Sequence, residues 1–60
     1  MNINTATLEE LKTLNGIGDV IAERIIEYRS LNAFKSKEDI MSVDGIGKGI
    51  YEKIKDRIIC

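Results

Sequence analysis

The chain has 60 residues, of which 43% are hydrophobic and 32% are charged, with no proline and a formal net charge of −1. This composition fits one small folded domain rather than a disordered segment, and no apolar run approaches the roughly 20 residues of a membrane-spanning helix. We therefore expect no membrane insertion by this segment, and the absence of a basic excess argues weakly against nucleic acid as a partner.

The first half of the chain predicts a short helix, a glycine turn and a longer helix. Thr7 and Glu10 have the spacing of a capping box, which starts a helix. The apolar residues that follow share one helical face: Leu8, Leu11 and Leu14. This helix ends at the glycines of residues 15–18, and helical spacing then predicts a second helix over roughly Asp19–Leu31, about 20 Å long.

The second half repeats this order after a linker. Residues 31–35 lose the helical periodicity, and Phe34 is expected to fill the core from this linker. A weaker capping box at residues 36–39 starts a third helix, which carries Ile40 and Val43 and ends at the second group of glycines. A fourth helix follows, with these apolar residues at helical spacing: Ile50, Tyr51, Ile54 and Ile58.

The two halves are copies of one unit. Sliding the sequence against itself aligns residues 8–29 with residues 37–58, and such a repeat predicts the same structure twice. Neither unit has enough apolar surface to fold alone. We predict an all-α fold of two helical hairpins, with four helices and a short linker packed as one compact domain over residues 1–60. The first unit spans about residues 4–31 and the second about residues 35–60.

The phrase Gly-Ile-Gly occurs at residues 16–18 and 45–47 and invites comparison with nucleotide-binding loops. A dinucleotide fingerprint would need a preceding strand and a third small residue where Ile21 or Ile50 stands. A P-loop would need a different spacing between its first glycine and Lys48, with a hydroxyl residue next to that lysine. Both types of nucleotide site are therefore rejected.

Each phrase instead predicts a turn that leads directly into a helix. Glycine permits a positive φ and the close approach of another backbone, while the first N–H groups of the following helix lack internal partners. Together with the positive end of the helix dipole, these N–H groups form a site that suits a phosphate. Ile17 and Ile46, between the glycines, should anchor the turns in the core. The alternative is that both phrases merely connect helices, but their duplication favours a grip on two phosphates.

The residue types argue against an enzyme. The chain has no histidine and its one cysteine is the terminal Cys60, so neither a nucleophilic triad nor a zinc site can be assembled. The acidic pairs at residues 9–10 and 38–39 fall in first turns of helices, where carboxylates interact favourably with the dipole. We interpret Cys60 as a chain-end residue without chemistry. The aromatic residues are too few for a platform that stacks single-stranded bases: Tyr28, Phe34 and Tyr51.

Several stretches together resemble a known family. The Asn-Ile-Asn-Thr-Ala start at residues 2–6, the Leu-Glu-Glu-Leu stretch at residues 8–11, both hairpins and their spacing are similar to the tandem helix-hairpin-helix domain of the bacterial competence protein ComEA family. The resemblance covers essentially the whole chain. It implies binding of double-stranded DNA without sequence preference, with the hairpin backbones on phosphates at either side of the minor groove.

The resemblance has further implications for the setting of the domain. In that family the parent is a membrane-anchored receptor on the outer face of the cell membrane, which takes part in DNA uptake. If a longer anchored parent exists, the domain is expected there, and otherwise in the cytoplasm, because this segment alone does not decide export. The resemblance also allows a monovalent cation on the carbonyls of the turns, while no other cofactor, no metal site and no small-molecule substrate is expected. The oligomeric state is open.

Carried over by position, the resemblance places one phosphate site at each turn. The first comprises Gly16, Gly18 and the amides of Asp19 and Val20, and the second comprises Gly45, Gly47, Lys48 and Gly49. Lys48 directly follows the second turn, and Lys53 lies about one and a half turns further on, so both are expected to reach a phosphate held there. The alternative for both lysines is a solvated helix face paired with acids.

The first turn departs from the family pattern. Relatives usually have lysine or arginine at the position of Ile21, and the Asp19 carboxylate would repel a phosphate. We therefore expect the second turn to contribute most of the DNA binding. Asp19, Ile21 and the negative net charge also favour an alternative function, in which the domain keeps the fold as a protein-interaction or structural module with little DNA affinity.

Overall fold

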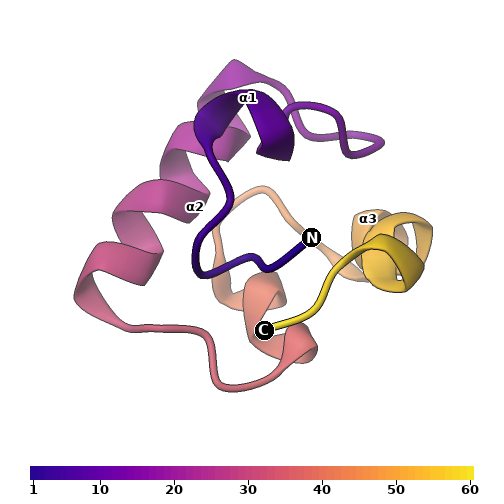
Figure 1. Cartoon of the computed structure of the whole chain (residues 1–60). Helices are drawn as coiled ribbons and strands as arrows, with labels where there is room; N and C mark the ends of the chain where they lie inside the picture. The colour runs from indigo at the N-terminus through magenta and orange to yellow at the C-terminus, as the bar shows by residue number, and fades with distance from the viewer.

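The structure is a computed structural model that describes residues 1–60. Its helices follow in this order: α1 (Leu8–Leu11), α2 (Asp19–Leu31), the 3₁₀ helix η1 (Lys37–Ser42), α3 (Lys48–Ile54) and the 3₁₀ helix η2 (Lys55–Arg57). Figure 1 shows α2 on one side of the molecule and α3 on the other, with both chain ends between them. The predicted all-α fold of two helical hairpins is confirmed.

The first unit forms largely as its sequence predicts. The Thr7 hydroxyl accepts a hydrogen bond from the Glu10 amide at 3.1 Å, and the Glu10 carboxylate accepts one from the Thr7 amide at 2.8 Å. This predicted capping box is therefore present, and the second of these bonds lowers the pKa of the Glu10 carboxyl. Regular α-helix stops at Leu11, but Leu14 is still buried at the end of the following turns. The bounds of α2 match the prediction.

The second unit differs from its sequence prediction in two ways. Its first helix, η1, is a 3₁₀ helix, and the Ser36 side chain makes no capping bond. The Asp39 carboxylate accepts a hydrogen bond from the Lys35 amide at 2.8 Å instead, so the expected second capping box does not form. The final helix is split, because α3 ends at Ile54 and the tighter η2 follows. Ile58 beyond η2 is nevertheless buried, as its helical spacing predicts.

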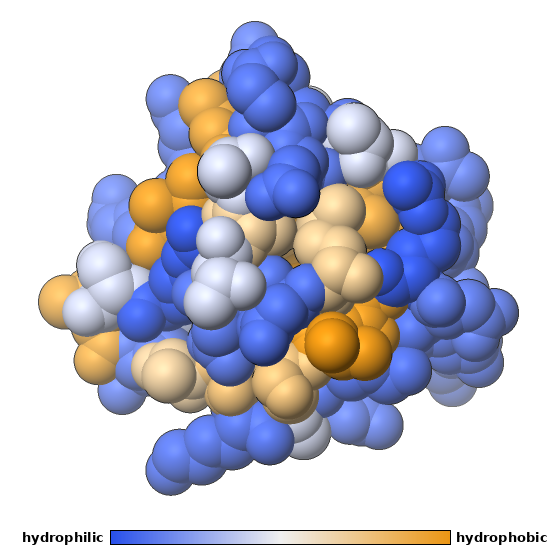
Figure 2. Space-filling view, viewed as in Figure 1, coloured by the Kyte–Doolittle hydropathy of each residue, from blue (hydrophilic) through white to orange (hydrophobic).

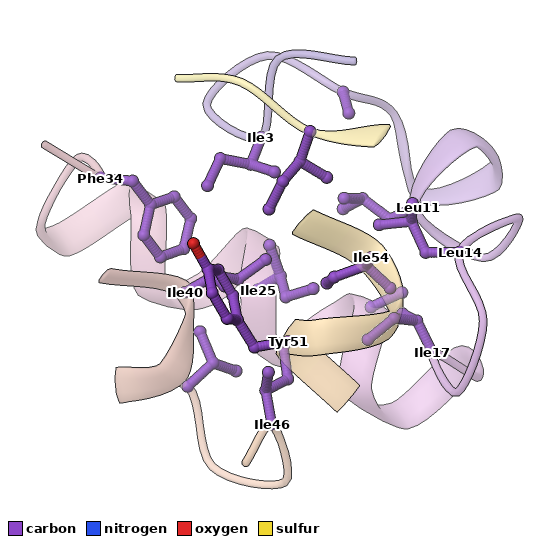
Figure 3. Close-up of a cluster of buried hydrophobic side chains, with 14 residues drawn as sticks. Ile3, Leu11, Leu14, Ile17, Ile25, Phe34, Ile40, Ile46, Tyr51 and Ile54 are labelled. Atoms are coloured by element: carbon purple, nitrogen blue, oxygen red, sulfur yellow. The ribbon is translucent and has the colours of Figure 1, made fainter. Parts of the chain in front are cut away.

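One hydrophobic core of 14 buried residues joins the two units, and it contains no charged side chain (Figure 3). Positions that the repeat matches are buried in pairs: Leu11 with Ile40, Leu14 with Val43, Ile17 with Ile46, Ala22 with Tyr51 and Ile25 with Ile54. Phe34 enters from the linker with 3% of its surface exposed, which confirms the predicted role. Tyr28 stacks on it with 5.1 Å between the ring centroids. Each unit thus covers the apolar side of the other.

The residues at the start of the chain form hydrogen bonds with the linker, with α2 and with the end of the chain. The Asn4 side chain accepts a hydrogen bond from the Phe34 amide at 2.8 Å and donates one to the Phe34 carbonyl at 2.9 Å. Arg29 of α2 donates to the Ile3 carbonyl at 3.0 Å. The two chain ends also pair, because the Ile3 amide donates to the Ile59 carbonyl at 2.9 Å. The linker and both termini therefore form one hydrogen-bonded end of the molecule.

Candidate nucleic-acid interface

The two glycine turns have nearly the same backbone geometry. Gly16 and Gly45 have φ angles of 86° and 98°, in the region that favours glycine, and no other residue type has a positive φ. Gly18 and Gly47 follow with extended φ angles of −96° and −97°, and each is the N-cap of the next helix. The residues between the glycines are buried as predicted: Ile17 is 4% exposed and Ile46 3%. Each turn is therefore anchored by its isoleucine and leaves its backbone outside.

Both turns present backbone N–H groups that have no partner within the chain. The first bonds inside the following helices are those from Ala22 to Gly18 at 2.9 Å and from Tyr51 to Gly47 at 3.0 Å. No side chain caps either helix. The amides of the first helical residues therefore donate to no protein group, and these residues are exposed: Asp19, Val20, Lys48 and Gly49. This is the arrangement of donors that binds an anion at a helix start.

The two turns lie close together because each packs against the other unit. A Cβ built on Gly16 would lie 3.3 Å from Cγ1 of Ile50, in the first turn of α3. A Cβ built on Gly45 would lie 3.3 Å from Cγ1 of Ile21, in the first turn of α2. This reciprocal contact places each glycine turn beside the start of the other unit's second helix. The sequence predicted two turns but not that they meet in this way.

Alanine substitutions at two glycines are expected to change the stability of the fold in opposite directions. Gly16→Ala is expected to destabilise the fold by about 1–2 kcal/mol, because alanine is strained at positive φ and its Cβ presses on Ile50. Gly49→Ala, in α3, has nothing within 4 Å of its Cβ and should stabilise by about 0.5–1 kcal/mol through helix propensity. Urea unfolding of both variants measures the difference, and two shifts of the same sign would contradict the geometry of the turn.

Ile21 has a structural role at the contact between the two units. Its side chain packs against Gly45 and is only partly exposed, so it contributes to the contact between the units. The nearby Asp19 carboxylate is not free, since it lies 2.7 Å from Nζ of Lys12, which also lies 3.5 Å from Glu9. The hydrogen bond to Asp19 is the main cause that raises the pKa of Lys12. This pair was not predicted from the sequence, and in it Lys12 offsets the charge that Asp19 brings to the first turn.

Two arginines fasten the turns to the opposite unit. Arg24 of α2 donates from Nη1 to the Asp44 carbonyl at 3.3 Å, directly before Gly45. Arg57 of η2 donates from Nη1 to the Thr13 carbonyl at 3.0 Å, shortly before the first turn. Neither arginine was predicted to lie at the interface. Their partners are 20 and 44 positions away, and no pattern in the chain indicates pairs so distant.

The lysines predicted for the second turn are exposed and unpaired. Neither Lys48 nor Lys53 has an acidic partner within 4.0 Å, in contrast to Lys55, which lies 2.9 Å from Glu52. The hydrogen bond to Lys55 is the main cause that lowers the pKa of the Glu52 carboxyl. Pairing with acids, the alternative interpretation, therefore does not describe Lys53. Lys48 forms no ion pair either, but it lies near enough to Glu52 to help lower the pKa of that carboxyl. The charges of both lysines are available to an external anion.

The exposed hydrophobic residues do not gather into one large patch on the visible face. The visible face in Figure 2 is largely hydrophilic, with hydrophobic residues in separate areas. The large hydrophobic residues that are exposed lie at the two ends of α2, in η1 and near the C-terminus: Val20, Leu31, Met41 and Ile59. None of the helices combines the length and apolar character that crossing a membrane requires.

The helix-hairpin-helix motif model matches residues 1–59, which is nearly the whole chain. The chain belongs to the helix-hairpin-helix family. Its two turns, each with a buried isoleucine between glycines and a helix directly after, are the hairpins of this motif in two copies. We refer to the turn at residues 15–18 as the first hairpin and the turn at residues 44–47 as the second hairpin.

The chain is similar to segments of proteins of different kinds. The chain is 54% identical over 97% of its length to ComE operon protein 1 of Bacillus subtilis, of which it spans 29%. It is 49% identical over 98% of its length to an uncharacterised protein of Haemophilus influenzae, of which it spans 54%. It is 46% identical over 97% of its length to endonuclease/exonuclease/phosphatase family domain-containing protein 1 of Homo sapiens, of which it spans 10%. The chain thus covers only part of these relatives, and the resemblance to the competence family is confirmed.

Proposed function

We propose that this domain binds double-stranded DNA without sequence preference, through phosphates held at its two hairpins. The observation that carries the proposal is the reciprocal packing of Gly16 on Ile50 and Gly45 on Ile21, which brings two groups of unpaired amides close together. Contacts of backbone amides to phosphates carry no sequence information. The proposed contact residues are Gly16, Gly18, Asp19, Val20, Gly45, Gly47, Lys48, Gly49 and Lys53.

The second hairpin is proposed to contribute more of the affinity. Lys48 is exposed without an acidic partner, whereas Lys12 at the first hairpin is engaged by Asp19. The formal net charge of −1 means that few cations neutralise phosphates. We therefore expect a dissociation constant toward the weak end of the 10⁻⁴–10⁻⁶ M that is typical of non-specific binding at physiological salt. Several copies on one duplex, or basic regions next to this domain, would raise the affinity by avidity.

The similarity to ComE operon protein 1 supports the proposal that this domain binds DNA during DNA uptake in competence. The domain itself is proposed to be non-enzymatic. The relative named for an endonuclease/exonuclease/phosphatase family domain shares only this segment, since the chain spans 10% of that protein. The chemistry that this name indicates is therefore not carried over to this chain.

One observation favours a second candidate function, a protein-interaction module with little DNA affinity. An open groove of about 300 Å³ lies beside the second hairpin, and Leu31 at its edge is 77% exposed. A module of this kind would need no cations at the hairpins. The unpaired Lys48 and Lys53 are therefore the feature that favours DNA over this alternative.

Fluorescence anisotropy with short labelled duplexes tests the proposal. Two duplexes of equal length and unrelated sequence should bind with dissociation constants that agree within about twofold. The logarithm of the binding constant should fall with the logarithm of the salt concentration with a slope of about −2, because roughly two phosphates are neutralised. A preference for one sequence would contradict phosphate-only contact, and no binding of either duplex at low salt would favour the protein-interaction module.

A further inference from the structure

We infer that each hairpin receives its helix-borne cation from the opposite unit: Arg24 of α2 contacts the DNA phosphate at the second hairpin, and Lys53 of α3 contacts the one at the first. This inference rests on the proposed DNA binding and specifies which side chains serve which phosphate. From its place in the sequence, Lys53 was expected at the second hairpin, and Arg24 was given no role. The inference differs on both residues.

The Arg24 guanidinium lies against the second hairpin. Its Nη1 lies 3.3 Å from the Asp44 carbonyl oxygen and would lie 3.2 Å from a Cβ on Gly45. The guanidinium is therefore in contact with the second hairpin, although Arg24 belongs to the first unit. A guanidinium has five N–H donors, and only one hydrogen bond to a protein group is formed here. The remaining donors are available to a phosphate that docks on the hairpin, which is the group arginine binds best.

The helix register supports this placement. Ile21 and Arg24 are three residues apart, so they lie on the same face of α2. Both contact Gly45, which shows that this face of the helix is turned toward the second hairpin along its first two turns. The packing of α2 therefore directs Arg24 toward the second hairpin.

No acidic side chain neutralises the charge of Arg24, so this charge is free to attract an anion. Glu27 and Asp44 line the same groove, yet no carboxylate lies within 4.0 Å of the guanidinium. Its only recorded partner is a neutral carbonyl, and the residue is exposed. A cation that served only to neutralise a neighbouring acid would form an ion pair with it, and Arg24 forms none.

The repeat extends the inference to Lys53. Ile50 corresponds to Ile21 and Lys53 to Arg24, and Ile50 packs on Gly16 just as Ile21 packs on Gly45. Lys53 lies on the same face of α3 as Ile50, because the two are three residues apart. That face is turned toward the first hairpin. Lys53 is exposed and has no ion pair, so its charge is also free.

Amide-resolved NMR titration of the whole chain with a short duplex at low salt tests the inference. The variants are Arg24→Gln, which removes the charge, and Arg24→Lys, which keeps it. We expect Arg24→Gln to reduce the shift changes at residues 45–49 more than those at residues 16–20, and to weaken binding about threefold. The salt slope should become smaller in magnitude by about 0.9. Arg24→Lys should retain the slope, and Lys53→Gln should give the reverse pattern along the chain.

The outcomes separate this inference from the proposed function. If the unmodified chain shows no shift at either hairpin, the DNA-binding proposal fails. If it binds, but Arg24→Gln leaves the slope and the residue 45–49 shifts unchanged, only the cross-unit assignment fails. If Arg24→Lys loses as much binding as Arg24→Gln, Arg24 acts through its hydrogen bond to Asp44 and the inference is overturned. Unfolding curves of all variants show whether the fold itself is retained.

Discussion

Ile25→Ala is expected to remove half or more of the stability of the domain. Ile25 is fully buried in the middle of α2, where it joins the core that both units share. Truncation of a buried isoleucine costs about 2–5 kcal/mol, from lost transfer energy and the cavity that remains. A domain of this size has a total stability of roughly 3–9 kcal/mol, at about 0.05–0.15 kcal/mol per residue. The urea midpoint of Ile25→Ala should therefore fall to about half of the original value or lower.

Leu31→Ala is the matched control for this substitution. Leu31 is the last residue of the same helix and is 77% exposed, so its truncation opens no cavity. Urea unfolding followed by circular dichroism compares the two variants, with Ile54→Ala as the repeat-related partner of Ile25→Ala. Equal midpoints for Ile25→Ala and Leu31→Ala would show that the shared core does not hold the units together.

Lys48→Glu is expected to weaken binding to every duplex by about tenfold at low salt. Reversing one charge about 6 Å from a phosphate changes the interaction energy by about 1.4 kcal/mol when water screens the pair. Because the contact is to phosphate, the loss should be the same for all base sequences. The fold should not suffer, since an acidic residue at the start of α3 interacts more favourably with the helix dipole than lysine does.

Lys35→Glu provides the same change of charge at a distant place. Lys35 is exposed in the linker, which follows the C-terminal end of α2, whereas the hairpins lie at the start of the second helix of each unit. A helix of 13 residues separates these ends by about 20 Å, well beyond the screening length of about 8–10 Å. Anisotropy titrations of both variants should therefore differ, and similar losses would indicate a general charge effect without a hairpin site.

The sequence was sufficient for those features that depend on neighbouring residues. The bounds of α2, the capping box at Thr7 and the burial of Ile17 and Ile46 were all predicted and are all confirmed. Each follows from local rules: apolar spacing, cap chemistry and a glycine turn. The repeat made these predictions stronger, because each position could be checked against its copy.

Features that depend on distant residues were not predicted. The η1 segment is a 3₁₀ helix, and its expected capping box is absent because the Asp39 carboxylate bonds to Lys35. The hydrogen bonds of Arg24 and Arg57 join residues from different units. Such contacts arise only when the two hairpins pack, so no local pattern reveals them. The division into units at residues 4–31 and 35–60, and the roles of the phosphate-contact residues, stay predictions.

The most direct test of the account is a backbone amide titration of the unmodified chain with a short duplex, repeated at moderate salt. We expect salt-sensitive shift changes at both hairpins, larger for residues 45–49 than for residues 16–20, and little change in the linker. These amides have no partner within the chain, so a docking phosphate should shift them strongly. Unchanged amides at both hairpins at low salt would contradict the proposed phosphate sites and leave protein interaction as the function of this face.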